Sequence, residues 1–600
     1  MTGAEYIAEF LHRKKLNNIF LVTGGAIAFV VDAIGIKNKA KYFCFNHEQS
    51  AAMAADSVWR ATNGKDIGVC MATSGPGAVN LLSGLGCSYV DSIPSIAITG
   101  QVNSIESLKY GNYKDLRQAG YQEIDIVKMS KNVTKFSVKI ESAFELKYNL
   151  EKAYQIATSG RKGPVLIDVP MNIQQEEVGN FENFNLNYQK ESSELFSFKE
   201  LNLLKNFFLN TKRPLILVGA GVGLSGKSAE IINWINKKKL PFVSTWSAFS
   251  SFDHFNKNYF GHIGIYGNRG SNFIVQNCDS LLVLGSRLEN RVRSSNPINF
   301  APEAKKLVID VDNNELLKYH DSNYLTLNKD LCDVAMKLAK IRVPKIDKTW
   351  LNYLYSVKKD FFNKDISTFA KKNKSMSPYK VIMEINKKIK NTDIITSDCG
   401  AHLCWLYQVF KRKKQTIFTA AGFGPIGYSI PAAIGAAISS KKKVIAVCGD
   451  GSFQVQLSEL ILIKKLKLKI NFIILNDFGY GIVKQFQDSY MNKRYHAADI
   501  KKGYNIPDFK KIANAYNLKY IKIKNYKDLN KLNISNKPSL IEVFIKKNTL
   551  IEPKMGFGGL INDQFPSMSD EDFLRYNKFV FFKRREIKKI SKNSKAQNHE

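Results

Sequence analysis

The sequence lacks any long apolar run. Its longest runs, such as 215–219 and 444–448, are only as long as strands, whereas a membrane-spanning helix needs about 20 apolar residues. The first 15 residues are polar and contain no signal-peptide core. These absences argue against a membrane-spanning or secreted protein, so we expect no membrane partner and a cytoplasmic location.

Paired cysteines are also missing. The eight cysteines stand apart in apolar segments, with no Cys-x-x-Cys spacing. Zinc sites usually show that spacing, and small secreted domains carry dense disulfide frameworks. We therefore expect neither, and interpret the cysteines as reduced core residues.

Acidic residues are scarce relative to basic ones. The 53 Asp and Glu stand against 88 Lys and Arg, which gives a formal net charge of +35. Nucleic-acid-binding proteins cluster such charge to neutralise phosphates. Here the lysines are spread along the whole chain, without a zinc finger, an aromatic RNA-binding signature or a basic-region heptad. We expect no nucleic-acid partner, and interpret the one basic cluster, 583–595, as a frayed tail.

The chain is too long for one hydrophobic core, since domains usually hold about 100–200 residues. Three regions alternate short Val/Ile/Leu runs with helical periodicity, and polar stretches at 174–197 and 345–377 separate them. This alternation predicts βαβ repetition and an α/β protein of three doubly wound parallel-sheet domains. The predicted boundaries are 1–175, 195–342 and 376–550, followed by a tail at 551–600. In such sheets, ligands bind at the carboxyl ends of the strands.

The strongest motif follows two apolar runs of the third region. Gly449-Asp450-Gly451-Ser452 ends the first run, and Asn476-Asp477-Phe478-Gly479-Tyr480 ends the second. Mg²⁺ prefers oxygen ligands, commonly a carboxylate with carbonyl and phosphate oxygens. The Asp450 carboxylate, the Asn476 amide oxygen and the Phe478 carbonyl would supply three of them. Gly451 would let the backbone approach a phosphate, and a helix predicted at about 456–467 would offer its N-terminus to the anion.

This pattern, with Asn 26 residues after the Asp, resembles the motif of thiamine-diphosphate enzymes, although that family more often has Asn-Asn at 476–477. The resemblance implies thiamine diphosphate and Mg²⁺ as cofactors, and a carboxylic acid that contacts N1′ of the aminopyrimidine. Glu48, in a His-Glu-x-x-Ala pattern between an apolar run and a helix, is the candidate. Burial there would raise its pKa and suit it to proton exchange near neutral pH. The other cofactor-binding candidates of the motif are Gly449, Gly451, Ser452, Gly479 and Tyr480.

From about residue 3 to 550 the chain is similar to the acetohydroxyacid (acetolactate) synthases. The matching segments include 23–27, 73–80, 91–94, 98–102 and 165–170. The resemblance places Gly25 beside the thiazolium and Gln101 beside the bound intermediate, as catalytic candidates.

Residues 422–428 look like the family's loop that bends the cofactor. Ile426 would be the wedge between the two rings, and the Gly424 carbonyl would accept from the 4′-amino group. His402, close to Gly400, matches a histidine that contacts the diphosphate, although the family's usual Gln is Ala401 here.

The central region resembles the flavin-binding domain of the synthases. A glycine-rich turn at 219–226 follows an apolar run, and Arg287 and Asp310 match residues that meet FAD in that family. The family's usual Met-His is His262-Ile263 here, and related decarboxylases keep this fold while binding ADP or nothing. The sequence therefore leaves FAD, ADP and no ligand open.

The substrate pocket departs from the family too. Lys135 and Arg291 match cationic residues near the mouth of the synthase active site, where they suit a carboxylate. Lys135 is a catalytic candidate, and Arg291 is a candidate substrate contact. Phe486 stands where synthases have the tryptophan that shapes the site for a second keto acid. The part after residue 551 looks like that of synthase-like proteins of surface-sugar pathways.

The resemblance implies a thiamine-diphosphate-dependent carboligase. It would decarboxylate a 2-keto acid, pyruvate first among them, and transfer the two-carbon unit to a second 2-keto acid or a keto-sugar. A non-ligating decarboxylase is the first alternative, and a basic nucleic-acid-binding or scaffold protein without catalysis is the second. In the family the cofactor lies between the first domain of one subunit and the third domain of its partner, which implies a homodimer or homotetramer.

Overall fold

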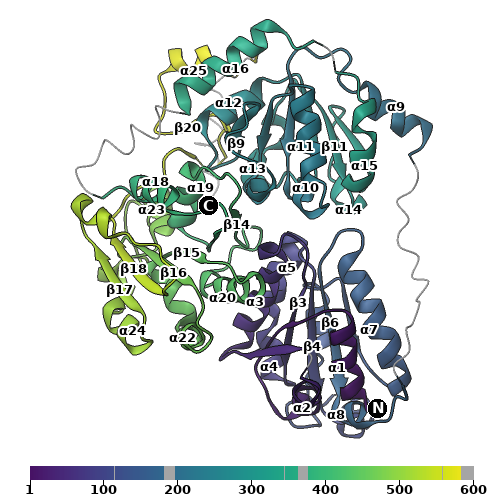
Figure 1. Ribbon diagram of the computed structural model, residues 1–600. Coiled ribbons are helices and arrows are strands. Elements are labelled where there is room, and N and C mark those ends of the chain that lie inside the picture. Colours follow the sequence, from purple (N-terminus) through teal and green to yellow (C-terminus); the bar gives the residue numbers. More distant parts are fainter. Residues whose placement is uncertain are drawn as a thin grey trace.

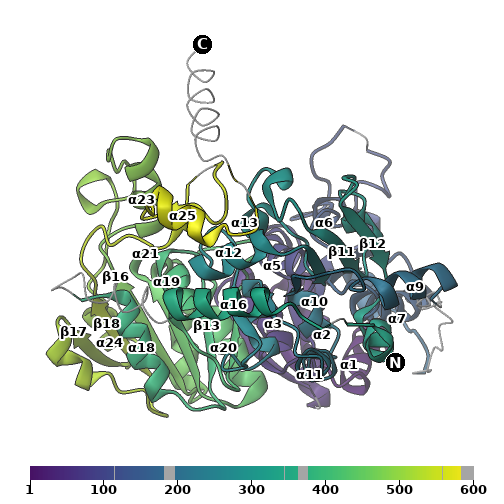
Figure 2. The same ribbon diagram turned by 90° about the horizontal axis from the view of Figure 1, so that it is seen from above.

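The computed structural model describes residues 1–38, 40–113, 115–180, 196–343, 345–362, 376–556, 558–580 and 582. Within them the chain builds three lobes, each around a six-stranded parallel sheet flanked by helices (Figures 1 and 2). The strand orders are β2-β1-β3-β4-β6-β5, β12-β11-β10-β7-β8-β9 and β14-β13-β15-β16-β18-β17. The predicted fold class, three doubly wound parallel sheets, is confirmed.

The first lobe contains the first sheet, and its central strands are buried along their whole length, which explains their continuous apolar runs. The strands are β1 (Asn18–Leu21), β2 (Lys41–Cys44), β3 (Gly68–Ala72), β4 (Ser95–Gln101), β5 (Phe136–Lys139) and β6 (Pro164–Pro170). The helices are α1 (Gly3–Arg13), α2 (Ala28–Lys37), α3 (Glu48–Ala61), α4 (Pro76–Asn80), α5 (Leu82–Asp91), α6 (Ile126–Ser130), α7 (Ala143–Thr158) and α8 (Met171–Gln175), with the 3-10 turn η1 (Gly25–Ile27).

In the second lobe two glycine turns pack against each other. They approach so closely that a Cβ on Gly285 would lie 2.6 Å from the Cα of Gly221. Its strands are β7 (Pro214–Val218), β8 (Phe242–Ser244), β9 (Tyr259–His262), β10 (Ser280–Leu284), β11 (Lys305–Asp310) and β12 (Tyr324–Asn328). Its helices are α9 (Phe198–Asn206), α10 (Ala220–Leu224), α11 (Ser228–Lys237), α12 (Arg269–Asn277), α13 (Asn290–Arg293), α14 (Asn313–Leu316), α15 (Leu331–Lys337) and α16 (Lys348–Phe361).

The third lobe carries the metal-type motif. Its strands are β13 (Ile394–Ser397), β14 (Thr416–Phe418), β15 (Val444–Gly449), β16 (Ile470–Asn476), β17 (Lys519–Ile523) and β18 (Ser539–Phe544). Its helices are α18 (Pro378–Lys388), α19 (Ala401–Val409), α20 (Ser429–Ser440), α21 (Asp450–Phe453), the 3-10 helix η6 (Gln454–Leu460), α22 (Ile461–Lys465), α23 (Gly481–Tyr490) and α24 (Phe509–Ala515). The helix predicted at 456–467 differs, because helical backbone starts at Asp450, directly after β15, and is interrupted at Gln456 (φ −126°, ψ 37°).

The tail is structurally part of the second lobe. It forms β19 (Lys554–Met555), β20 (Gln564–Phe565) and α25 (Asp570–Tyr576), which lies beside α16 in Figure 1. Leu560 and Phe573 are buried in the core of that lobe, and Asn272 Nδ2 donates to the Ile561 carbonyl at 2.8 Å. The apolar residues Met555, Leu560, Ile561, Phe573 and Tyr576 therefore complete this core, whereas the basic cluster 583–595 lies outside the described residues.

Two helices join the first and third lobes. The small residues of α3 let α20 approach closely, and a Cβ on Gly435 would lie 2.4 Å from the Ala54 carbonyl oxygen. Apolar side chains of both lobes form one continuous core there. None of the helices within the described ranges combines the length and the apolar character that crossing a bilayer requires.

Candidate active site

The carboxyl edge of the third sheet gathers the residues of the metal-type motif. β15 and β16 are neighbours in register, with Gly449 opposite Leu475, so Asp450 and Asn476 emerge side by side. Asp450 Oδ2 accepts from the Gly479 N–H and from the Tyr504 hydroxyl, both at 3.0 Å. Its other oxygen, Oδ1, is buried and has no hydrogen-bond partner.

A buried carboxylate oxygen without a partner is costly, and it therefore calls for a cation or a proton. Burial and the neighbouring Asp477 raise the pKa of Asp450. Asn476 Oδ1 accepts from the Phe478 N–H at 3.1 Å and keeps a second lone pair, while its Nδ2 donates to Glu542 at 2.7 Å. These donors fit a hard cation such as Mg²⁺.

The described part of the chain holds no cluster of three or more His, Cys, Asp or Glu poised for a metal. A cation at Asp450 would therefore depend on amide, main-chain and ligand oxygens. Phe478 has a left-handed backbone (φ 60°), uncommon for a residue other than glycine and frequent at functional turns.

The Asp477 position carries its own counter-charge. Asp477 and Lys484 are both buried, and Lys484 Nζ lies 3.8 Å from Asp477 Oδ2 and donates to the Asp477 carbonyl at 3.0 Å. The departure from Asn-Asn thus comes with a cation seven residues further on, at the start of α23. Sequence reasoning missed Lys484 and Tyr504, because neither belongs to the motif.

The predicted diphosphate contacts are packed tightly around this edge. Ser452 Oγ accepts from the Gly449 N–H at 3.1 Å. A Cβ on Gly451 would lie 2.5 Å from the Tyr480 ring, and a Cβ on Gly479 would lie 2.2 Å from the Ala498 carbonyl oxygen. Only glycine fits at these two positions, because any side chain would collide with the Tyr480 ring or the Ala498 carbonyl.

His402 and Gly400 lie at the same edge. His402 Nε2 and Asp398 Oδ1 are hydrogen-bonded at 2.6 Å, and a Cβ on Gly449 would lie 2.9 Å from His402 Nδ1. The imidazole therefore presents its other nitrogen beside the end of β15. Asp398 was missed from the sequence, although it stands four residues before His402.

Asp398 also holds the loop at 422–428. Its Oδ2 accepts from the Gly427 N–H at 3.2 Å and from the Ser429 hydroxyl at 2.9 Å. Gly424 and Gly427 have φ of 70° and 83°, where glycine is favoured. Ile426 is 41% exposed, as expected for a side chain that awaits a partner.

The first lobe presents Glu48, Gly25 and Gln101 at the carboxyl edge of its own sheet. Glu48 is the first residue of α3, and its Oε2 accepts from Asn80 Nδ2 at 2.9 Å. It is partly buried within the single chain, so the burial expected from the sequence is only partial there. A Cβ on Gly25 would meet nothing within 4 Å, which leaves room for a ligand.

Gln101 is held by a buried carboxylate. Its Nε2 donates to Asp168 Oδ2 and to the Ile124 carbonyl, both at 2.9 Å, and Thr99 Oγ1 donates to Asp168 Oδ1 at 2.7 Å. Burial outweighs these bonds and raises the pKa of Asp168 to about 7. Apart from its place in a matching segment, nothing in the sequence indicated this role of Asp168.

Lys135 lies away from these residues. It precedes β5, at the amino edge of the sheet, and its Nζ donates to the Ile156 and Ser159 carbonyls, at 2.6 and 3.0 Å. Those carbonyls end α7, so the ammonium caps a helix C-terminus. Within one chain the structure does not bring Lys135 to Glu48, and its substrate role stays a prediction.

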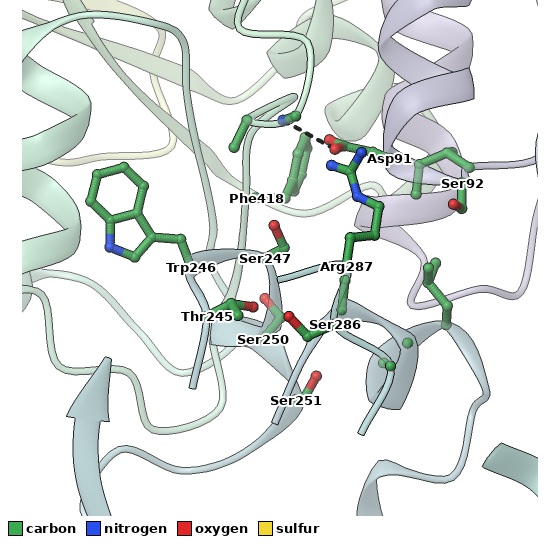
Figure 3. A pocket seen from close by; sticks show the side chains of 18 of the residues that line it. Asp91, Ser92, Thr245, Trp246, Ser247, Ser250, Ser251, Ser286, Arg287 and Phe418 are labelled. Atoms are coloured by element: carbon green, nitrogen blue, oxygen red, sulfur yellow. Dashed lines mark hydrogen bonds between the residues drawn. The ribbon is translucent and has the colours of Figure 1, made fainter. Parts of the chain in front are cut away.

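A cavity of about 560 Å³ lies where the three lobes meet. Both glycine turns of the second lobe line it, together with Arg287, Asp310 and Arg291. Figure 3 shows Arg287 directed at Asp91, whose Oδ1 accepts from the Gly422 N–H at 3.1 Å. The predicted dinucleotide residues and the start of the cofactor loop therefore share one wall.

The two predicted substrate residues lie near this wall and at the third lobe. Arg291 lines the cavity, and its carbonyl accepts from the Ile265 N–H at 2.8 Å. Phe486 is 43% exposed on α23, and its ring lies 4.8 Å from that of Tyr490. Both side chains are available to a ligand.

Comparison with known proteins identifies the family. Residues 1–129, 202–338 and 398–543 match models of thiamine pyrophosphate enzymes, for the N-terminal TPP binding domain, the central domain and the C-terminal TPP binding domain. An acetolactate synthase large subunit of Cyanidium caldarium is 32% identical over 88% of this chain and 90% of its own length. The chain belongs to the acetolactate synthase large-subunit family.

Two relatives of lower sequence identity are acetolactate synthases as well. The acetolactate synthase isozyme 2 large subunit of Escherichia coli is 30% identical over 86% of this chain and 90% of its own length. The mitochondrial catalytic subunit of Saccharomyces cerevisiae is 28% identical over 95% of this chain and 84% of its own length. The predicted family and its thiamine-diphosphate dependence are confirmed.

Proposed function

We propose that this chain is a carboligase that decarboxylates a 2-keto acid, pyruvate first, and transfers the two-carbon unit to a carbonyl acceptor. The observation that carries the proposal is the buried, unpartnered Oδ1 of Asp450 beside Asn476, at the strand ends of a thiamine-pyrophosphate-enzyme lobe. The proposal includes no membrane partner, no nucleic-acid partner and no secretion. The cytoplasmic location stays a prediction.

The third lobe would hold the cofactor. Asp450 Oδ, Asn476 Oδ1 and the Phe478 carbonyl would coordinate Mg²⁺. α21 starts directly after Gly449, and its N-terminus would favour the negative diphosphate because the first N–H groups of a helix and the helix dipole point there.

The remaining third-lobe residues would orient the coenzyme. Ser452, Gly479, Tyr480, Gly400 and His402 would contact its diphosphate end. Gly424 and Ile426 would fix the bent conformation, the first through its carbonyl and the second through its apolar bulk. Bound thiamine diphosphate supplies the electron sink for decarboxylation.

The first lobe would supply proton transfer and substrate contacts. Glu48 would hold a proton shared with N1′ of the aminopyrimidine, and Gly25 would leave room for the thiazolium. Gln101 and Arg291 would face the keto acid, since Arg binds a carboxylate with two parallel hydrogen bonds. Lys135 would have to reach the keto acid of another subunit, because within one chain its ammonium caps α7.

The acceptor is a second 2-keto acid or a keto-sugar. Phe486 keeps aromatic bulk at the position where the family has tryptophan, and its exposure leaves it free to contact either. A decarboxylase that protonates its intermediate instead is the second candidate.

We also propose the central cavity as the site of a ligand with a pyrophosphate group, either FAD or ADP. The two glycine turns leave bare backbone, and Arg287 supplies a cation, as a pyrophosphate requires. Asp310 ends β11 beside the cavity, in a position suited to ribose hydroxyls.

The active site would be completed by a second copy of the chain, in a homodimer or homotetramer. Several large apolar side chains beside the candidate site are about two-fifths exposed in the single chain: Tyr42, Phe423, Ile426 and Val455. Covering them would bury apolar area that water now touches.

One experiment tests the function. Cofactors released from the purified protein are identified by mass spectrometry, and the protein is then incubated with pyruvate, alone and with candidate keto acids and keto-sugars. Thiamine diphosphate and a carbon–carbon product are expected. Acetaldehyde without any ligated product would replace the carboligase with a decarboxylase.

A binding arm separates both enzymes from a non-catalytic protein. Thiamine diphosphate with Mg²⁺ should quench the aromatic fluorescence of the native chain and leave Asp450→Ala unchanged. Quenching that persists in Asp450→Ala would refute the assignment of this site.

A further inference from the structure

A buried glutamate of the third lobe grips the turn that precedes Glu48. Glu459 lies on η6, and its side chain is inaccessible to solvent. Its Oε1 accepts from the His47 N–H at 3.1 Å, and its Oε2 accepts from the Asn46 N–H at 3.2 Å. Asn46 Nδ2 also donates to the Ser458 carbonyl at 2.9 Å. The two residues directly before Glu48 are therefore tied to another lobe.

The electrostatics of this contact fit a fixed anion. Glu459 accepts from the main-chain N–H groups of Asn46 and His47 and from the Asn46 side-chain amide. Burial raises the pKa of its carboxyl group, and these donors oppose the rise because they hydrogen-bond the charged form. The carboxylate lies at the N-terminus of α3, where the helix dipole and unpaired N–H groups favour negative charge. The Glu459 carboxylate therefore stabilises the single backbone turn at Asn46 and His47.

A second hydrogen bond joins the same two segments on the other side of Glu48. The break in η6 at Gln456 coincides with a hydrogen bond of 2.6 Å, donated by Ser50 Oγ to Gln456 Oε1. One face of η6 therefore meets the first turn of α3 at two points, one before Glu48 and one after it. The segment begins at Asp450, so the metal-type residue and this grip belong to one short stretch of chain.

We propose that Glu459 is a positioning residue for Glu48. This proposal rests on the proposed function, in which the Glu48 carboxyl group exchanges a proton with the cofactor. Glu459 fixes the peptides of Asn46 and His47, and these fix the Cα of Glu48 and the direction of its side chain. Displacing a catalytic group by about 1 Å costs on the order of 100-fold in rate.

Glu459→Gln tests the geometry with little change in size. The carboxylate has two acceptor oxygens for two N–H donors, whereas the amide has one oxygen and an NH₂ that would face a donor. One peptide of the turn loses its partner, and the turn relaxes. Ser50→Ala is the matched control, because it removes the neighbouring bond to Gln456 and leaves the Asn46 and His47 N–H groups bound.

The measurement is the exchange of the C2 proton of bound thiamine diphosphate for deuterium, followed by acid quench and proton NMR. Fluorescence titration gives the affinity for the Mg²⁺ complex of thiamine diphosphate separately. Glu459→Gln is expected to slow exchange by roughly 10- to 100-fold and to change this affinity by less than about 3-fold, since Asp450 and Asn476 are untouched. Ser50→Ala should exchange as the native chain does.

Exchange at the native rate in Glu459→Gln overturns the proposal, and so does an equal slowing in Ser50→Ala, which would mean a general loosening between the lobes. Glu48→Gln is the third arm, and native exchange there would refute the role of Glu48 itself. Glu459→Asp keeps the charge but is one methylene shorter. It carries the test if the Gln variant does not fold, with slowed exchange expected and native exchange overturning the proposal.

Discussion

Arg60 is the centre of a buried ion cluster between the first and third lobes, and replacing it should be severely destabilising. Its Nε lies 2.8 Å from Asp56 Oδ2, and its Nη2 lies 3.0 Å from Asp91 Oδ2. Its Nη1 donates to the Thr419 carbonyl at 3.0 Å. The Arg60 side chain is 10% exposed, and those of Asp56 and Asp91 are 0% and 9% exposed.

The perturbation is Arg60→Met, which keeps most of the apolar stem. Removing one partner of a buried ion pair costs about 3–5 kcal/mol, because the remaining charge is left uncompensated. Two carboxylates are left here, so we expect a loss in the upper half of that range. Urea unfolding at pH 7, followed by tryptophan fluorescence, measures the free energy of unfolding.

A triple variant tests whether the stranded charges cause the loss of stability. Asp56→Asn and Asp91→Asn, added to Arg60→Met, remove the stranded charges, and this triple variant should regain at least half of the loss. Burial already raises the pKa of Asp91 while Arg60 opposes it, so without Arg60 the loss should shrink as the pH falls. If Arg60→Met lowers the free energy of unfolding by less than about 1 kcal/mol, the cluster contributes no more than a surface ion pair does. A triple variant that is no more stable than Arg60→Met would refute the role of the stranded charges.

Two further predictions concern buried carboxylates. Asp450→Asn should stabilise the metal-free protein by on the order of 1 kcal/mol, because it removes a buried charge. The same variant should lose the increase in melting temperature that Mg²⁺ with thiamine diphosphate causes in the native chain. An Mg²⁺-dependent increase that survives would refute the metal site. Burial raises the pKa of Asp168 from 3.8 to about 7, so the folded state binds a proton that the unfolded chain has released. Stability from this group is complete below pH 4 and is lost as the pH rises through 7. Asp168→Asn should flatten the dependence of the urea midpoint on pH in this window, and an unchanged slope would contradict the assignment.

The sequence predicted the parts of the site that lie at strand ends. Asp450 and Asn476 each follow a fully apolar run, and parallel neighbours bring such ends together. It could not predict Tyr504 or Glu459, because their contacts arise from tertiary packing and follow no local period. The helix start at Asp450 was missed for a similar reason, since its first turn carries no amphipathic pattern and is fixed by the end of β15.

The packing of the tail on the second lobe could not be predicted from the sequence either. Residues 551–580 have little helical or strand periodicity, apart from one short helix, and thus read as an appendage. Their apolar residues fill gaps over α12 and α16, and Tyr353 donates its hydroxyl to the Tyr576 carbonyl at 2.7 Å. Their structure is therefore determined by packing on the second lobe and not by a local sequence pattern.

The charge of the candidate site is opposite in sign to the charge of the chain. The sequence carries a net +35, yet Asp398, Asp450 and Glu459 are buried carboxylates whose hydrogen-bond donors are mainly N–H groups, hydroxyls and a histidine. A diphosphate would bring further negative charge to Asp450, which repulsion at low dielectric would oppose. The cation must therefore arrive with the diphosphate or before it, so the affinity for thiamine diphosphate should depend steeply on Mg²⁺ while the lysine-rich surface attracts the anion from solution.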